Sequence, residues 1–126
     1  MRVMHGAALT LLLAVSGTGW ELVAHLGPIN AVYVEPAKAK DIAVLGSIID
    51  DLLAKNGREH PIQIDFFDDK DLTPRTRPYP ATSKPAYRAK YNFNPANGLS
   101  RFVWILPADP NEPSGKLKEV EEKLPH

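Results

Sequence analysis

Residues 29–67 read INAVYVEPAKAKDIAVLGSIIDDLLAKNGREHPIQIDFF, with a strand pattern on either side of a helix pattern. Residues 29–34 are mainly β-branched or aromatic and lie between Pro28 and Pro36, which predicts a strand with well-marked ends. Residues 62–65 alternate between apolar and polar side chains and are followed by two phenylalanines. This pattern predicts a second strand over residues 62–67. A strand, a helix and a strand within about forty residues form a βαβ unit, so we expect the two strands to lie parallel.

The segment between the two strands carries apolar side chains at spacings of three and four, which predicts an amphipathic helix. Pro36 is tolerated in the first turn of a helix, while Lys55 and Gly57 suit the last turn and the C-terminal cap. We therefore expect one long helix from Ala37 to Asn56, packed on one face of the sheet. Its apolar stripe comprises Ile42, Leu45, Ile48, Ile49, Leu52 and Leu53.

The remaining sequence predicts a long loop and then a hairpin. Residues 72–82 are rich in proline and cannot pair as a central strand. Residues 95–98 read Pro-Ala-Asn-Gly, and Asn-Gly supplies the positive φ angles of tight turns. Residues 99–106 follow as a strand with apolar side chains on both faces, expected at or near the sheet centre. The expected fold is α/β (or α+β): a three- to four-stranded mixed sheet with a βαβ unit, one long helix on one face and a C-terminal hairpin strand.

Residues 83–94 have two interpretations. Ser83 could cap a short helix with Pro85 in its first turn, which would place Tyr87 and Tyr91 on one helical face. In the alternative interpretation, residues 91–94 are extended.

Residues 1–16 fit a signal peptide. Arg2 precedes an almost wholly apolar run over residues 7–15, which is too short to span a bilayer alone. Small residues near its end predict cleavage after Ser16, so the mature protein is expected to be periplasmic or extracellular. The alternative is an uncleaved N-terminal helix that packs on the core or anchors in a membrane, continuing through Trp20, Leu22, Val23 and Leu26.

Export gives the first testable prediction. When the protein is expressed in a bacterium with its native N-terminus, we expect it outside the cytoplasm, starting at or near Gly17. Cell fractionation followed by N-terminal sequencing measures this. A soluble cytoplasmic product that keeps Met1 would contradict export.

The composition limits the classes of function. The 126 residues suit one globular core, assigned to residues 17–108, with a flexible charged tail at 109–126. The formal net charge of +0 gives no field that would attract nucleic acid non-specifically. The sequence contains no cysteine, which excludes disulfides, thiol nucleophiles and cysteine-ligated metals. Because HExxH, GxSxG, P-loop and GxGxxG motifs are also missing, we expect no cofactor and favour a binding protein over an enzyme.

Four aspartates lie at the C-terminal end of the second predicted strand, where open α/β sheets place ligand crevices. Clustered carboxylates can hold a hard divalent cation, so a metal-binding protein or a metal-dependent enzyme is the alternative function. Their spacing does not match an EF-hand, and a solvated strand end is the competing interpretation. The candidate ligands are Asp65, Asp68, Asp69 and Asp71.

Residues 72–107 contain no acid and six cations, interleaved with aromatic residues. Cations beside flat rings are typical of surfaces that bind anionic small molecules or polymers. The competing interpretation is that the basic segment folds across the acidic residues 59–71 and neutralises them. The candidate binding residues are Arg75, Arg77, Tyr79, Arg88, Tyr91 and Arg101.

These features together predict a small exported binding or interaction module. Its expected partner is an anionic small molecule, a polymer or a protein, while export disfavours nucleic acid as a natural partner. Membrane contact is expected only through an uncleaved N-terminal segment.

Overall fold

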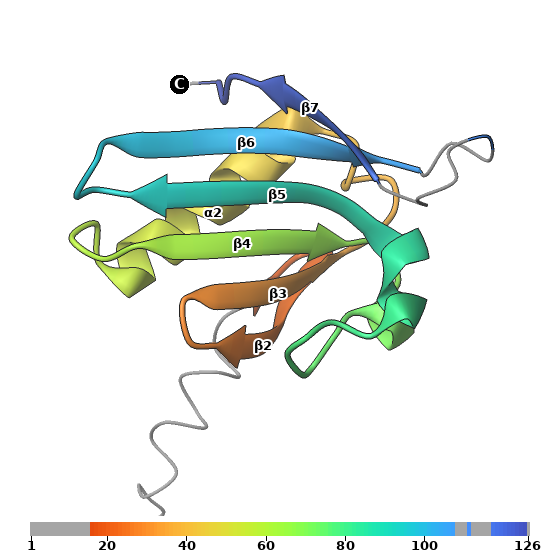
Figure 1. Cartoon of the computed structure of the whole chain (residues 1–126). Coiled ribbons are helices and arrows are strands. Elements are labelled where there is room, and N and C mark those ends of the chain that lie inside the picture. The colour runs from red at the N-terminus through yellow and green to blue at the C-terminus, as the bar shows by residue number, and fades with distance from the viewer. Residues whose placement is uncertain (1–15, 108–110, 112–116, 126) are drawn as a thin grey trace, which may run out of the picture.

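A computed structural model describes residues 16–107, 111 and 117–125, and these form a seven-stranded sheet with one long helix against it (Figure 1). The order of the strands in the sheet follows their order in the sequence. The strands are β1 (Ser16–Gly17), β2 (Trp20–Leu26), β3 (Ile29–Val34), β4 (Ile62–Phe67), β5 (Tyr87–Asn94), β6 (Leu99–Leu106) and β7 (Lys118–Glu122). The helix is α2 (Ile42–Asn56), and two short 3-10 helices, η2 (Lys70–Leu72) and η3 (Ala81–Ala86), lie between β4 and β5.

The predicted βαβ unit is confirmed. β3 and β4 lie parallel and are joined through α2, whereas every other neighbouring pair in the sheet is antiparallel. The mixed α/β class and the single long helix are therefore confirmed as well. The expected number of three to four strands is wrong, because the sheet has seven.

The predicted start of the helix at Ala37 is wrong by five residues. The residue that begins α2 is Ile42, because the Asp41 carboxylate caps the preceding end by accepting hydrogen bonds from the backbone N–H of Ala43 (2.9 Å) and of Val44 (3.4 Å). The predicted end at Asn56 is confirmed, and the glycine that follows adopts a φ of 87°.

Two strands occupy segments for which the sequence predicted something else. The alternative of an N-terminal helix running through residues 20–26 is wrong, because those residues form β2 and pair with β3. The expected flexible tail over residues 109–126 is wrong in part, because residues 118–122 form β7 and pair with β6. The signal-peptide prediction falls mainly on residues 1–15, which lie outside the described residues.

The segment after the proline-rich loop is extended rather than helical. The predicted helix carrying Tyr87 and Tyr91 on one face is wrong, because both residues belong to β5. The alternative of an extended segment at residues 91–94 is confirmed. The hairpin at residues 95–98 is also confirmed, with Gly98 at a φ of 74° between β5 and β6.

The main hydrophobic core fills the space between α2 and one face of the sheet. Phe66 and Ile64 of β4 lie at its centre and are fully buried. β6 is covered on both faces as predicted, since Phe102 faces α2 while Val103, on the opposite face, is equally buried. β6 is nevertheless the sixth strand of seven rather than a central one. None of the described helices is both long and apolar enough to cross a membrane.

A second, smaller cluster lies on the opposite face of the sheet. Its buried members are Ala31, Phe67 and Ala86. The rings of Tyr79 and Tyr87 pack on Phe67, with ring centroids 5.7 Å and 4.9 Å away. This cluster attaches the segment between β4 and β5 to the sheet, at the end where β4 stops (Figure 1).

Candidate functional site

The six basic and aromatic candidates do not gather on one surface. Arg75 and Arg77 lie exposed on the proline-rich loop. Tyr91 points into the main core, where its hydroxyl lies 2.8 Å from Ser100 Oγ. Arg101 lies on the face away from α2, with its Nε 3.1 Å from a Glu121 carboxylate oxygen. Strand alternation separates them, because neighbouring residues of β5 and β6 point to opposite faces.

Arg88 is held by the acidic end of β4. Its Nε donates to a carboxylate oxygen of Asp68 at 2.7 Å, and its Nη1 donates to the Tyr87 carbonyl at 3.2 Å. The competing interpretation, that the basic segment neutralises the preceding acids, is therefore correct for this pair. Arg75 and Arg77 make no ion pair within the part of the chain that the structure describes.

The four aspartates do not converge. Asp68 pairs with Arg88, while the Asp69 side chain accepts from the Asp71 backbone N–H at 3.0 Å and caps η2. Asp65 faces the opposite side of the sheet from α2 and is fully buried. Among residues 16–107, 111 and 117–125, no three His, Asp or Glu side chains could hold a metal ion. The structure therefore gives the metal hypothesis no support.

Asp65 is instead the centre of a closed hydrogen-bond cluster. One carboxylate oxygen accepts from the Tyr79 hydroxyl at 2.5 Å and the other from the Tyr87 hydroxyl at 2.6 Å. The Gln63 amide donates to both oxygens, at 3.0 and 3.2 Å. Gln63 and Asp65 share a face of β4 because they are two residues apart, while Tyr87 begins the neighbouring strand and Tyr79 reaches in from the loop.

The electrostatics of this cluster favour a structural role. Burial raises the pKa of the Asp65 carboxyl, against the opposing effects of Tyr79, Tyr87, Gln63 and the charge of Lys90. Burial and then the nearby Asp65 charge raise the pKa of both phenols well above their ordinary value. Both tyrosines consequently stay protonated and donate to Asp65. Because the carboxylate is fully buried and already accepts these bonds, we infer that it fastens the loop rather than contacting a ligand.

Two open pockets lie where β5 begins and β6 ends, at the same end of the sheet as the carboxyl ends of β3 and β4. Their volumes are about 400 and 450 Å³, and they share Arg88, Leu106 and Pro107. The first is also lined by Lys84, Tyr87 and Leu117, and the second by Lys40, Trp104 and Ile105.

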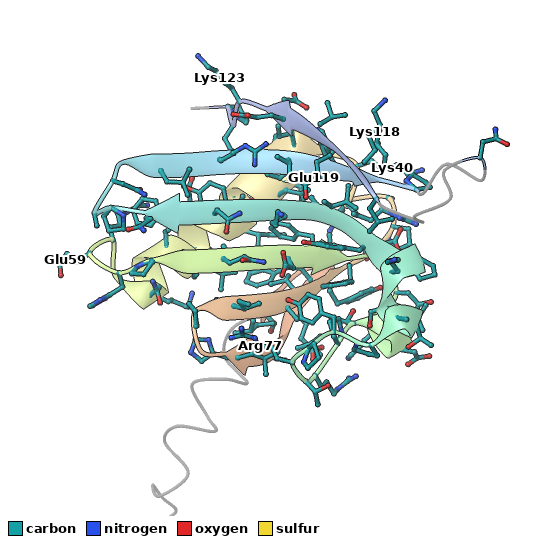
Figure 2. All side chains as sticks on the ribbon, in the orientation of Figure 1. Lys40, Glu59, Arg77, Lys118, Glu119 and Lys123 are labelled. Atoms are coloured by element: carbon teal, nitrogen blue, oxygen red, sulfur yellow. The ribbon has the colours of Figure 1, made fainter. Side chains whose placement is uncertain are left out.

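The charged side chains that line these pockets are cations, although Asp68 pairs with one of them, Arg88. Lys40, Lys84 and Arg88 line them, and no acidic side chain does so among the described residues. Figure 2 labels Lys40 at this end of the sheet, beside the end of β6. A pocket lined by both apolar side chains and cations can hold a carboxylate, phosphate or sulfate that carries an apolar group.

Sequence reasoning found Arg88 of this set but did not assign Lys40 or Leu106 to a site. Lys40 belongs to the turns before α2 and lies far from Arg88 in the sequence. The predicted helix from Ala37 would have included it. One available signal was the rule that ligand crevices lie beyond the carboxyl ends of parallel strands, which points to the segment after Val34 as well as to the end of β4.

No protein-family model matches this chain, and neither a curated protein nor a solved structure shows significant similarity to it.

Proposed function

We propose that the protein is an exported binding module that takes an anionic, partly apolar group at the end of the sheet where the two pockets meet. The supporting observation is that Lys84 and Arg88 line one pocket and Lys40 and Arg88 line the other, beside apolar side chains and without a lining acid among the described residues. The expected ligand is an organic anion or an acidic, apolar segment of a partner protein.

Arg88 is the residue best placed to recognise the anion. Asp68 holds its Nε and the Tyr87 carbonyl holds its Nη1, so the guanidinium plane is already oriented before a ligand arrives. No hydrogen bond within the described residues uses its Nη2. An arginine fixed in this way loses little side-chain entropy on binding and offers its remaining donors to a carboxylate, phosphate or sulfate.

Burial of apolar surface is expected to add to the affinity that the cations provide. Trp104 is partly buried and lines the second pocket, while Leu106 lines both pockets and is 38% exposed. Covering these side chains with an apolar group removes their surface from water, which stabilises the complex. An amphipathic anion should therefore bind better than an inorganic anion of equal charge.

The test uses octyl sulfate as the probe, below its micelle concentration, with inorganic sulfate for comparison. We expect octyl sulfate to change the tryptophan fluorescence because Trp104 lines one pocket, and inorganic sulfate to act much more weakly. Arg88→Gln and Lys40→Gln should each weaken binding by about tenfold, the loss of one charge-assisted contact.

Arg75→Gln is the matched control, since it removes the same charge from an exposed arginine that lines neither pocket. It should leave the affinity within about twofold, as expected for a screened surface charge. Thermal melting of each variant separates a loss of binding from a loss of folding. If Arg75→Gln weakens binding as much as Arg88→Gln, or if octyl sulfate does not bind, the proposed site is wrong.

A further inference from the structure

β7 forms one edge of the sheet, and its outer backbone groups have no partner strand among the described residues. All of its residues are exposed, including Val120 at 43%. An edge strand of this kind can pair with another extended chain through its unpaired N–H and C=O groups. The sequence of β7, Lys-Glu-Val-Glu-Glu, indicates which chain would fit.

The charged side chains on the two faces of β7 differ in whether they form ion pairs within the molecule. On the face away from α2, Glu119 lies 3.1 Å from Lys90 Nζ and Glu121 lies 3.1 Å from Arg101 Nε. On the α2 face, Lys118 makes no ion pair within the described residues, and Figure 2 shows it pointing away from the sheet beyond β7.

Glu122 and Val120 share the α2 face with Lys118, because they follow it at intervals of two. Glu122 accepts a hydrogen bond on one carboxylate oxygen from the indole of Trp104 on β6, at 2.6 Å. One cation and one anion therefore lie at equal distances on either side of Val120.

We propose that a second copy of this chain pairs with β7, antiparallel and centred on Val120. This symmetric pairing places Lys118 of each copy opposite Glu122 of the other, and it brings the two Val120 side chains together. Glu119 then faces Glu121 of the other copy on the opposite face, where Lys90 and Arg101 already compensate both charges. The result is one continuous sheet through two molecules.

A five-residue strand buries little surface, so the dimer is expected to be weak and to depend on protein concentration. Charged edge strands usually discourage pairing, but here the charges on the α2 face are complementary when the strand meets itself. None of the β7 residues lines either pocket, although Glu122 contacts Trp104, which lines the second one. The dimer is measured by mass and the anion site by ligand binding, so each proposal can fail without the other.

The experiment measures mass by sedimentation equilibrium across a range of concentrations, up to the millimolar range and at low salt. The unmodified protein should form dimers reversibly. Lys118→Glu places two pairs of like charges across the interface, as does Glu122→Lys, and each variant should stay monomeric at every concentration. The double variant Lys118→Glu, Glu122→Lys restores both opposite-charge pairs and should dimerise again.

Mixing the two single variants is the sharpest measurement. A heterodimer of Lys118→Glu with Glu122→Lys again pairs opposite charges at both positions, so the mixture should dimerise although neither component does. Circular dichroism confirms that each variant is folded. A protein that stays monomeric, or a dimer that ignores all of these charge changes, would overturn the proposal.

Discussion

Replacing Phe66 with alanine should lower the free energy of unfolding by about 3 to 5 kcal/mol, the usual cost of emptying a large buried aromatic site. Phe66 is fully buried in the main core. In the sheet register it lies between Val32 of β3 and Ala89 of β5, so strands on both sides would border the cavity. The surrounding structure can collapse little because the sheet backbone fixes these neighbours.

Chemical denaturation at neutral pH measures this loss. Phe93→Ala is the matched control, because it deletes the same atoms from a ring that is only partly buried at the end of β5. Its cost should be clearly smaller. Equal losses at the two positions, or a loss below about 1 kcal/mol at Phe66, would contradict the placement of the core at the centre of the sheet.

Replacing Asp65 with alanine should lower the free energy of unfolding by about 2 to 4 kcal/mol, because several hydrogen bonds lose their acceptor. The substitution leaves the hydroxyls of Tyr79 and Tyr87 and the Gln63 amide without their acceptor, and each buried donor that loses its partner costs about 1 to 3 kcal/mol. The relief from burying a carboxylate offsets part of this cost. Asp65→Asn keeps the shape and one acceptor oxygen, so it should cost less than Asp65→Ala.

The pH dependence follows from the raised pKa of Asp65. A carboxyl whose folded pKa lies above its unfolded pKa binds protons more readily in the folded state. Its contribution to stability is present in full below the unfolded pKa and is lost as the pH rises through the folded pKa. Relative to Asp65→Asn, which does not titrate, the unmodified protein should therefore gain stability as the pH falls from neutral through the folded pKa of Asp65.

Urea denaturation of both proteins at a series of pH values gives the difference in unfolding free energy directly. Taking the difference removes the titrations that the two proteins share. A difference that stays constant with pH, or one that moves in favour of Asp65→Asn as the pH falls, would show that the charged form of Asp65 is not penalised by its burial.

The parts of the fold that could be predicted are those where one periodic pattern dominates. β3, α2 and β4 each bury an apolar side along most of their length, so their patterns agree with the structure. The start of α2 was predicted too early because Pro36 fits the first turn of a helix. In the structure the Asp41 carboxylate accepts hydrogen bonds from two backbone N–H groups, so the helix begins after Asp41.

The edge strand β7 was not predicted, because its side chains are exposed to solvent and its pairing depends on residues of other strands. β7 is almost entirely charged, and its pairing depends on Lys90 and Arg101, which lie on other strands. In β5, Tyr87 and Tyr91 also fit helical spacing, but Ala89, Tyr91 and Phe93 follow an alternation of two that is typical of a strand. An irregularity in the pairing with β4 places Tyr87 on the opposite face.

The candidate site was harder to predict because it is assembled from distant segments. Asp65 was grouped with Asp68, Asp69 and Asp71 as a metal ligand, but its alternation with Ile64 and Phe66 places it on the face away from the helix. No local pattern joins Lys40 to Arg88, since the sheet register and the turns before α2 bring them to the same pocket.

The sequential order of the strands bears on how the chain acquires its structure. Every strand pairs with the one that precedes it along the chain, and the widest separation in sequence is across β3 and β4, where Ile29 lies opposite Gln63. Contact order is therefore low for a protein built mainly of strands, which favours rapid folding. Closing the segment that contains α2 is the costliest loop closure, and the later strands can then be added in the order in which a ribosome releases them.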